Sequence, residues 1–448
     1  MMRINGFVPL FVRLMVFAAL PAGMVVGGGR VMAQDRAADE AWFRPEADPV
    51  LLKAALLDGD VSSRWIYHDL NAAREQARAT GKPIVAVFRC VPCGSAAELD
   101  EALSAADGPM ADLLDRFVAV RVVKMNGVNR HVFQFDRDVP YAVMFLNADG
   151  VVYGRYGTRS SKVRSNLPRY TQPSFRKSLE RVLTLHGQYP GNRASLAGKR
   201  GSSAEPPAMP EDMPTMQPFP ANPKEVRNCI HCHMVGEAGL RKLLIDSRPT
   251  RRDLWPFPLP ENLGLRMNSD DNLLVRSVAA DSPAARAGVE PGDLLVSLGQ
   301  QPLVSEADVQ WVLHHAPDEA KLAVVLRRGG ESVQKTLDLQ GDWRKSATSW
   351  RASLGPARPG LMLEPDPFKQ KQGVGPADMG LTVRYPRGPA VKAGLRNGDL
   401  LIAIDGRSDL LMEADALKYI HIDRADAASA DLTVLRKGEK LTLTLPLR

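Results

Sequence analysis

Short runs of apolar residues, separated by turn-forming residues, characterise the first half of the chain. Residues 84–88 are all apolar, and residues 118–123, 142–146 and 151–153 form further runs that contain a single arginine. Uninterrupted apolar runs of this length are typical of strands buried on both faces of a sheet. The pattern therefore predicts a central sheet in this half of the chain.

Two amphipathic segments flank these strands and are expected to be helices. In the first, apolar residues recur at helical spacings from Trp65 to Ala77, and Gly81 is a stop signal before the first long strand. The second covers residues 173–186, where leucines and a valine share one face. Helices that alternate with buried strands indicate an α/β domain, which we place at residues 61–188.

The first cysteine pair directly follows this central apolar run. Cys90 and Cys93 form a C-x-x-C motif, and residues 95–103 are rich in helix formers. A strand, a C-x-x-C motif and a helix in this order are typical of a thioredoxin-type redox site. The helix N-terminus and the neighbouring cation Arg89 both favour the reactive thiolate form of cysteine. We therefore expect Cys90 to be the low-pKa thiol and Cys93 to be buried.

In these residues the chain resembles the thioredoxin superfamily. That family places a cis-proline before a strand, against the C-x-x-C motif, and the Val139–Pro140 bond matches its place. The resemblance implies that Cys90 attacks a substrate disulfide, that Cys93 resolves the mixed disulfide and that Pro140 holds the substrate strand. The family usually has tryptophan where this chain has Arg89. An inert structural disulfide is the alternative interpretation.

An internal repeat occupies the C-terminal half of the chain. Residues 275–295 and 383–401 share a proline, two alanines, two glycines, an aspartate and two leucines in register. Each copy continues into a strand, a helix and a closing hairpin. The glycines permit tight turns, and Asp293 and Asp399 are expected to cap the turns that follow them.

The repeat resembles the PDZ domain in its bacterial, circularly permuted form, so we expect PDZ domains at residues 260–341 and 350–448. The resemblance implies that each adds an extended peptide as a strand and captures its C-terminal carboxylate with backbone N–H groups. The residues that match the carboxylate-binding loop are Leu263, Gly264 and Leu265 in the first copy and Gly360 and Leu361 in the second. An insertion at residues 366–377 follows the second loop. Packing modules without ligands are the alternative.

Residues 189–224, between the two halves, are rich in proline, glycine and serine. This composition predicts an extended or disordered linker. Its methionines, Met209, Met213 and Met216, are either plain linker residues or ligands of a soft metal such as Cu(I). A short segment at residues 225–259 separates this linker from the first repeat.

The second cysteine pair lies in this short segment, within a C-x-x-C-H motif. Cys229, Cys232 and His233 match the attachment signature of a c-type haem, in which the thiols bind the vinyl groups and His233 binds the iron. Two other interpretations stay open. The cysteines and one or both of His231 and His233 are suitable ligands for zinc or another soft metal. Alternatively, they form a second disulfide that exchanges electrons with the first pair.

The N-terminus has the pattern of a secretory signal. Two arginines precede the apolar residues 14–20, and a small-residue site predicts cleavage before Gln34, so residues 1–33 are the signal peptide. An uncleaved anchor is the alternative. Residues 34–60 are a polar lead-in with an expected helix. This pattern places the protein in the periplasm or cell envelope.

Composition narrows the class of function. The 448 residues contain 44% hydrophobic and 24% charged residues, as in ordinary globular proteins, and all four cysteines belong to the two C-x-x-C pairs. The formal charge is +7, or +4 without the three arginines of the signal peptide. No basic run is interleaved with aromatic residues, which argues against nucleic acid as a partner. No Gly-x-Ser-Gly element lies near a suitable His and Asp, so a serine protease is not expected.

The domain order resembles a bacterial family of exported thioredoxin–PDZ proteins, in which some members replace a cysteine of the C-x-x-C motif with selenocysteine. The resemblance implies a thiol–disulfide redox protein whose partners are disulfide-bearing proteins and client C-termini, and the C-x-x-C-H motif makes haem c the candidate cofactor. The alternative is a non-enzymatic adaptor in which the thioredoxin fold is only a binding surface. The expected fold class is a multidomain α/β plus mainly-β protein.

Overall fold

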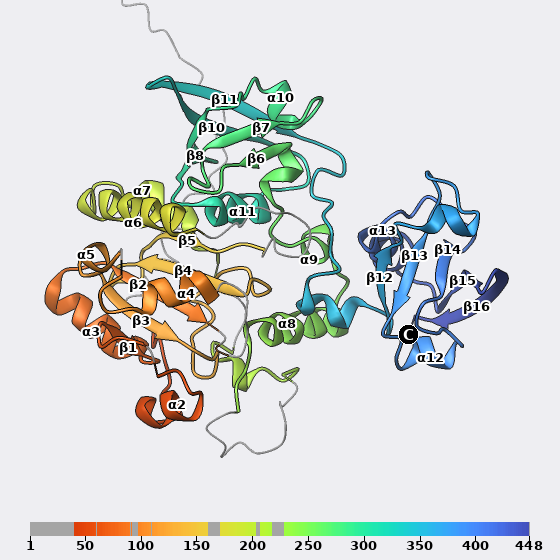
Figure 1. Cartoon of the computed structure of the whole chain (residues 1–448), viewed down its shortest axis with the longest axis horizontal. Coiled ribbons are helices and arrows are strands. Elements are labelled where there is room, and N and C mark those ends of the chain that lie inside the picture. Colours follow the sequence, from red (N-terminus) through yellow and green to blue (C-terminus); the bar gives the residue numbers. More distant parts are fainter. Residues whose placement is uncertain are drawn as a thin grey trace, which may run out of the picture.

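The computed structural model describes residues 40–59, 61–89, 91, 97–108, 110–159, 171–202, 207–216 and 228–447. The expected signal peptide and the first cysteine pair, Cys90 and Cys93, lie outside the described residues. The described chain forms an N-terminal α/β domain, a first repeat unit packed against it, and a second repeat unit beyond helix α8 (Cys232–Asp246) (Figure 1). No helix in these described ranges combines the length and apolar character that a membrane span requires.

The α/β domain is built on one sheet of five strands in the order β1-β3-β2-β4-β5. The strands are β1 (Trp65–Tyr67), β2 (Ile84–Arg89), β3 (Val118–Val122), β4 (Tyr141–Leu146) and β5 (Val152–Tyr156). β1, β3 and β2 are parallel, whereas β4 and β5 are antiparallel to their neighbours. Every residue of β2 to β5 is buried, which confirms the predicted strands. We call the edge where β2 and β3 end and β4 begins the C-terminal edge.

Helices cover this sheet, and one boundary differs from the prediction. They are α2 (Pro49–Ala55), α3 (Leu70–Thr80), α4 (Ala97–Ser104), α5 (Ala111–Leu114) and α6 (Gln172–Gly187). Trp65 was expected in the helix that became α3, but it lies in β1 and donates from Nε1 to the carbonyl of Leu103 (3.0 Å). The helix begins later because Asp69 is its N-cap and accepts from the backbone N–H of Asn71 and Ala72. Gly81 ends it in the left-handed region, as predicted.

The extended linker expected at residues 189–224 is wrong for its described parts. The chain there forms α7 (Arg193–Leu196) and the 3-10 helices η1 (Ala197–Lys199) and η2 (Pro210–Asp212). Leu196 and Lys199 are fully buried, and Met213 packs in the core of the α/β domain. Proline does not prevent this, because Pro210 opens its helix, where a missing N–H costs nothing. Met213 is therefore explained as a core residue.

The two repeat units share most of their order of elements. The first contains η3 (Pro260–Leu263), β6 (Leu265–Met267), β7 (Val275–Val278), α10 (Pro283–Arg286), β8 (Leu294–Leu298), β9 (Gln301–Pro302), α11 (Glu306–His315), β10 (Ala320–Arg328) and β11 (Glu331–Leu339). The second contains η4 (Ala352–Ala357), β12 (Met362–Pro365), η5 (Lys369–Gln372), β13 (Leu381–Arg384), α12 (Pro389–Lys392), β14 (Leu400–Ile404), α13 (Glu413–Lys418), η6 (Tyr419–Asp423), β15 (Ser429–Arg436) and β16 (Glu439–Pro446). In the described residues, β9 occurs only in the first unit, and η5 and η6 occur only in the second. Both predicted hairpins, β10–β11 and β15–β16, are present.

The repeated aspartates cap a different turn from the one predicted. Asp293 accepts from the backbone N–H of Glu290 (2.9 Å), and Asp399 accepts from that of Arg396 (2.8 Å), so each caps the turn that precedes it. Each carboxylate also binds an arginine of the closing hairpin, Arg328 or Arg436. In each unit the arginine of the closing hairpin holds the carboxylate against the preceding turn. The same polar contact therefore recurs in both units.

The first repeat unit is anchored to the α/β domain by an apolar contact. Val304 is fully buried and belongs to the same core cluster as Phe175 and Leu179 of α6. A Cβ at Gly154 of β5 would lie 2.6 Å from Val304, so only glycine leaves room for this side chain. Beside Val304, Lys199 of η1 forms an ion pair with Asp308 of α11, with 2.8 Å between Nζ and Oδ2.

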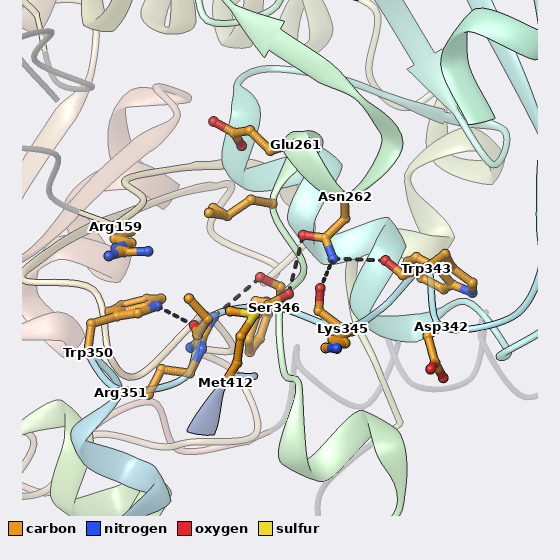
Figure 2. Close-up of a pocket in the computed structure, with 13 residues that line it drawn as sticks. Arg159, Glu261, Asn262, Asp342, Trp343, Lys345, Ser346, Trp350, Arg351 and Met412 are labelled. Atoms are coloured by element: carbon orange, nitrogen blue, oxygen red, sulfur yellow. Dashed lines mark hydrogen bonds between the residues drawn. The ribbon is translucent and has the colours of Figure 1, made fainter. Parts of the chain in front are cut away.

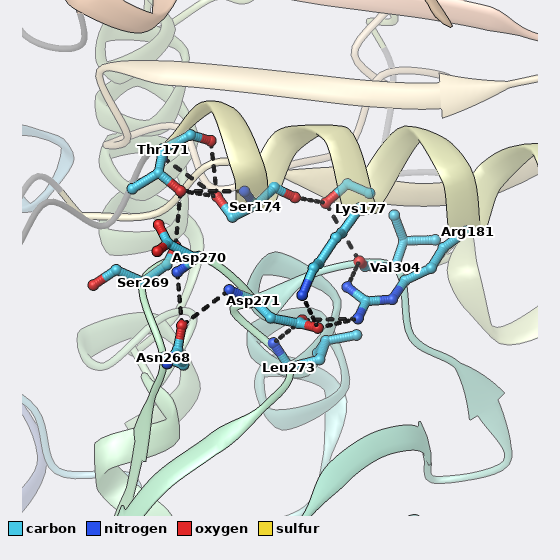
Figure 3. A network of polar contacts seen from close by, with 11 residues as sticks. Thr171, Ser174, Lys177, Arg181, Asn268, Ser269, Asp270, Asp271, Leu273 and Val304 are labelled. Atoms are coloured by element: carbon cyan, nitrogen blue, oxygen red, sulfur yellow. Dashed lines mark hydrogen bonds and ion pairs between the residues drawn. The ribbon is translucent and has the colours of Figure 1, made fainter. Parts of the chain in front are cut away.

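A polar network continues this interface along α6 (Figure 3). Asp271, in the loop between β6 and β7, pairs with Arg181 (2.7 Å) and Lys177 (3.1 Å). Thr171 donates to the carbonyl of Ser269 (2.9 Å). Burial alone would raise the pKa of Asp271, but the arginine and lysine outweigh it and hold that pKa below the ordinary 3.8. The α/β domain and the first repeat unit are thus joined through both core packing and charge.

Helix α8 lies between the α/β domain and the second repeat unit (Figure 1). Its residue Leu240 forms a small apolar cluster with Leu254 of α9 (Arg251–Leu254) and with Leu354 of η4. The proline-rich stretch after α9 packs as predicted, with Trp255 fully buried and the Phe257 ring stacked on His314 of α11. These contacts bring the second cysteine pair, at the start of α8, to the middle of the molecule.

Candidate functional site

The C-terminal edge of the sheet brings together parts of the chain that are far apart in sequence. Arg89, the last residue of β2, lines a small cavity of about 20 Å³ together with Cys232, the first residue of α8. Phe88 and Met125 line the same cavity. Cys90 follows Arg89 in the chain but lies outside the described residues, as does Cys93. The edge where a thioredoxin-type motif is expected therefore also holds the second pair.

The loop after β3 holds the second cysteine pair in place. Ile230 donates its backbone N–H to Asn126 Oδ1 (2.7 Å) and accepts at its carbonyl from Met125 N–H (2.8 Å). Cys229 and Cys232, on either side of it, are both half-buried. Burial raises the pKa of Cys229, and the opposing effect of Lys124 is smaller. Cys229 is therefore the poorer nucleophile at neutral pH.

Two features favour a thiolate at Cys232. It begins a helix of 15 residues, where the backbone N–H groups and the helix dipole stabilise negative charge. Arg137 lies within electrostatic reach of Cys232, and its guanidinium donates to the carbonyl of Phe133 (2.6 Å) and covers the Phe135 ring. Burial lowers the pKa of Arg137 to about 10, and the charge of Cys232 partly offsets this. Cys232 is thus the better nucleophile of the pair.

Arg89 is paired more fully than the sequence indicated. Its guanidinium lies 3.0 Å from Asp100 of α4, and Asp100 also binds Arg121 (2.6 Å), which in turn binds Asp58 (2.8 Å). Burial alone would lower the pKa of Arg121. The hydrogen bonds that Arg121 donates to the two aspartates outweigh the effect of burial and raise that pKa. The two positive charges of these arginines equal the two negative charges of these aspartates, so the charge of Arg89 is largely offset. Its expected effect on Cys90 stays a prediction.

Pro140 directly precedes β4, as expected, but its peptide bond is trans. Within the described ranges the cis peptide bond is Tyr189–Pro190, so the cis geometry implied for Val139–Pro140 is wrong. The preference between the two isomers is only about 0.5–1 kcal/mol, so the surroundings decide it. Here the preceding turn is held from outside, because Arg351 binds both Asp136 (2.8 Å) and Asp138 (3.1 Å).

The start of the second repeat unit therefore covers the loop where a thioredoxin substrate is expected. Arg351 is 2% exposed, and Ser353 also donates to Asp138, from its backbone N–H (2.8 Å) and its hydroxyl (2.5 Å). The sequence contained no signal for this contact, because a single arginine at the start of the second repeat does not reveal which distant carboxylates it binds.

The surroundings of Cys229, Cys232 and His233 bear on their three interpretations. A small cavity of about 20 Å³ lies beside Cys232. His233 Nδ1 forms a hydrogen bond with Glu237 (2.9 Å), and the His231 ring stacks on the His233 ring. Among the residues that the structure describes, no group of three or more His, Cys, Asp or Glu gathers as metal ligands do. The haem and metal interpretations stay predictions.

The predicted carboxylate-binding loops have the same geometry in both units. Gly264 lies in the left-handed region (φ +83°), and a Cβ there would lie 2.2 Å from Ser282. Gly360 lies in the same region (φ +80°), and a Cβ at Gly360 would lie 2.2 Å from the carbonyl oxygen of Arg387. Only glycine fits either position. Leu263, Leu265 and Leu361 beside them are buried.

The strands that follow these loops present an edge. In the described part of the chain, β6 pairs with β7 alone, and β12 is the outermost strand of its sheet. An edge strand offers unpaired backbone groups on one side, which a peptide strand can use. Both units therefore have the backbone arrangement that strand addition needs.

A larger cavity of about 600 Å³ lies beside the first loop, and the sequence did not reveal it (Figure 2). Asn262 donates from Nδ2 to the carbonyls of Trp343 (2.8 Å) and Lys345 (2.9 Å). Arg159, near the end of β5, lies over the Trp350 ring at 5.3 Å. The cavity thus joins the C-terminal edge to the start of the first loop.

Two protein-family models match parts of this chain. A thioredoxin-like model matches residues 65–148, and a PDZ-domain model matches residues 274–328. The chain contains a thioredoxin-like domain and a PDZ domain. The α/β domain is the former and the first repeat unit is the latter, which confirms the expected multidomain α/β plus β fold.

Curated relatives are similar over a limited part of their length. A probable periplasmic serine endoprotease DegP-like of Halomonas elongata is 30% identical over 143 residues, which cover 31% of this chain and 30% of that protein. One of Pseudomonas putida (strain W619) is 26% identical over 196 residues, which cover 42% and 40%. Periplasmic serine endoprotease DegP of Escherichia coli K12 is 27% identical over 140 residues, which cover 31% and 27%. This chain therefore spans less than half the length of these relatives.

Solved structures are similar over still shorter stretches. The HtrA3 PDZ domain bound to a phage-derived ligand is 29% identical, covering 14% of this chain and 60% of that one, with a TM-score of 0.14. The HtrA-type protease AlgW with a decapeptide is 20% identical, covering 25% and 35%, with a TM-score of 0.18. The assignment of the PDZ domain rests on the family model and on its element order.

Proposed function

We propose that the protein is an exported thiol–disulfide redox protein in which two dithiol pairs exchange electrons at the C-terminal edge. One observation carries the proposal: Cys232 and Arg89 line the same cavity. Cys90 follows Arg89 directly in the sequence, and the proposal takes its thiol to be within reach of Cys232.

The exchange balances within the chain. The Cys232 thiolate attacks one sulfur of a Cys90–Cys93 disulfide, a mixed disulfide forms, and the other sulfur of the first pair leaves as a thiolate. Cys229 then loses its proton and attacks Cys232, so a Cys229–Cys232 disulfide forms and the first pair is released as a dithiol. Two electrons move from the second pair to the first, and the reverse direction uses the same steps. Cys90 passes the electrons on to a client disulfide.

The PDZ domain and the second repeat unit provide client recognition in this proposal. We infer that the second unit is also a PDZ domain, supported by its element order and by the shared contact of Asp399 with Arg436. Unstructured protein C-termini add as strands to β6, with their carboxylate at Leu263, Gly264 and Leu265. Gly360 and Leu361 form the second loop. A peptide-library screen of the mature chain, with no C-terminal motif above background, would exclude this role.

Export is supported by the N-terminal pattern and by relatives described as periplasmic proteins. Residues 1–33 are the proposed signal peptide, and the periplasm or cell envelope is the proposed location. This is an oxidising compartment, in which dithiol exchange has substrates.

The competing proposal is a non-enzymatic adaptor, and one contact favours it. Arg351 and Ser353 bind the loop before Pro140, where a redox substrate would lie. Insulin-disulfide reduction by the mature chain (residues 34–448) separates the two. The redox proposal expects a rate that falls at least tenfold in Cys90→Ser. Equal, negligible rates for the wild type and Cys90→Ser support the adaptor.

A further inference from the structure

A positively charged cleft lies where the thioredoxin-like domain, α8 and the PDZ domain meet. Its volume is about 310 Å³, at the lower end of the roughly 300–1,000 Å³ typical of ligand pockets. Arg130 and Arg137 line it from the connection between β3 and β4, Arg252 lines it from α9, and Phe257 and Trp311 form its aromatic walls. We call it the arginine cleft. It is separate from the cavity beside Cys232 and from the PDZ loops.

The charges of the arginine cleft are of one sign. None of its described lining residues is an aspartate or a glutamate. Arg137 uses its guanidinium on a carbonyl, a methionine sulfur and the Phe135 ring, all of them uncharged. The adjacent carboxylate, Asp136, is bound by Arg351 instead. Burial lowers the pKa of Arg137 to about 10, and the charges of Cys232 and Asp136 offset this only in part, so an anion in the cleft would further stabilise the charged guanidinium.

The walls of the arginine cleft are flat and uncharged. The Phe257 ring stacks on His314, with 4.2 Å between centroids and 15° between planes. The Trp311 ring lies 4.0 Å from His315. Burial holds the pKa of His314 well below its ordinary value, so this imidazole is neutral at pH 7. Flat aromatic surfaces favour a planar ligand that can stack.

We propose that the arginine cleft binds a small planar organic anion with two or more carboxylate or phosphate groups. Arginine guanidiniums bind both groups in a bidentate manner, and the aromatic walls accept a ring. The volume of the cleft limits the ligand to a small molecule. This inference does not depend on the dithiol exchange proposed above.

The arginine cleft also adjoins the second cysteine pair. Val235 and Gly236 line it, and they lie one turn after Cys232 on the same face of α8. Arg137 is within electrostatic reach of Cys232 as well. An anion that binds Arg137 therefore competes with the Cys232 thiolate for this cation. Occupancy of the cleft is expected to slow the alkylation of Cys232.

Isothermal titration of the mature chain (residues 34–448) tests the inference. The probes are benzene-1,3,5-tricarboxylate, for carboxylates, and 1,3-phenylene bisphosphate, for two phosphates on a planar ring. Saturable binding of either probe, weakened by 300 mM salt, is expected, and the tighter probe identifies the anionic group. No saturable heat with either probe would overturn the proposal.

A matched pair of variants locates the binding. Arg252→Gln removes an exposed arginine of the arginine cleft and is expected to weaken binding about tenfold. Arg276→Gln removes an exposed arginine of β7 outside the cleft and is expected to leave the affinity unchanged. The alkylation rate of Cys232 should fall about threefold or more at saturating probe in the wild type. Equal affinities of the two variants would show that the anion binds elsewhere.

Discussion

Cys232 and Arg89 line one cavity at the C-terminal edge of the sheet, although 143 positions separate them in the sequence. Arg89 ends the strand that leads into the first cysteine pair, and Cys232 begins the helix that follows the second. The second pair is held here because Met125 N–H and Asn126 Oδ1 bind the carbonyl and the N–H of Ile230. The position of the second pair is therefore a property of the fold rather than of one mobile side chain.

The packing of Val304 against Gly154 predicts a large effect of a small substitution. Gly154→Ala is expected to destabilise the protein by roughly 1–3 kcal/mol, because the new Cβ would lie 2.6 Å from Val304. Gly59→Ala is the matched control, since nothing lies within 4 Å of its Cβ position. Urea unfolding of both variants measures the difference. Equal stabilities would show that the PDZ domain does not dock at this glycine.

The ion pairs of Asp271 predict a loss of domain docking in acid. Its folded-state pKa lies below the ordinary 3.8, so the unfolded state binds more protons as the pH falls. The stabilisation is therefore complete above about pH 5 and is lost as the pH falls through 3.8 toward the folded-state pKa. Asp271→Asn should lose roughly 1–3 kcal/mol at pH 7 and show a flatter acid limb. Unfolding free energies between pH 2 and 7 measure both effects, and an unchanged acid limb would contradict them.

The contact of Arg351 with Asp136 and Asp138 predicts unequal costs for two arginine substitutions. Arg351→Ala leaves two carboxylates without their cation in a buried site and should cost about 3–5 kcal/mol. Arg248→Ala removes an exposed pair with Asp426 and should cost about 0–1 kcal/mol. Chemical unfolding of both variants measures these two costs. Similar small costs would mean that the start of the second repeat unit does not hold the loop before Pro140.

The haem interpretation of Cys229, Cys232 and His233 is open to a direct test. The proposed dithiol exchange needs Cys229 and Cys232 as thiols, so it expects a colourless protein even from a host with a cytochrome c maturation system. A pyridine haemochrome assay and a haem-stained denaturing gel provide the readout. A covalently bound haem in that host would replace the second dithiol with an iron centre.

Local patterns predicted the strands and the repeats well, because each depends on neighbours in sequence. The apolar run at residues 84–88 became β2, and both hairpins formed where the turn residues indicated. Trp65 was misplaced because its apolar spacing fits a helix, whereas the cap at Asp69 starts the helix after it. The proline-rich segment was misread because composition does not reveal that Leu196 and Lys199 are buried under a distant helix.

The candidate site was predictable in its chemistry but not in its assembly. Both C-x-x-C pairs and the glycine loops were visible in the sequence, since their spacing carries the chemistry. The partners of Arg89, Arg137 and Arg351 were not visible, because each contact joins segments that only the folded chain brings together.

Trapping of a mixed disulfide between the two pairs tests the central claim most directly. In the mature Cys93→Ser/Cys229→Ser variant, one thiol of each pair remains, and mild oxidation should link Cys90 to Cys232 within one chain. Peptide mapping by mass spectrometry under non-reducing conditions detects this link. The Cys93→Ser/Cys232→Ser variant, which keeps Cys229, whose pKa burial raises, is the matched control and should form the link at least tenfold more slowly. If Cys90 and Cys232 stay unlinked while both react freely with added small disulfides, the two pairs do not exchange electrons and the account is wrong.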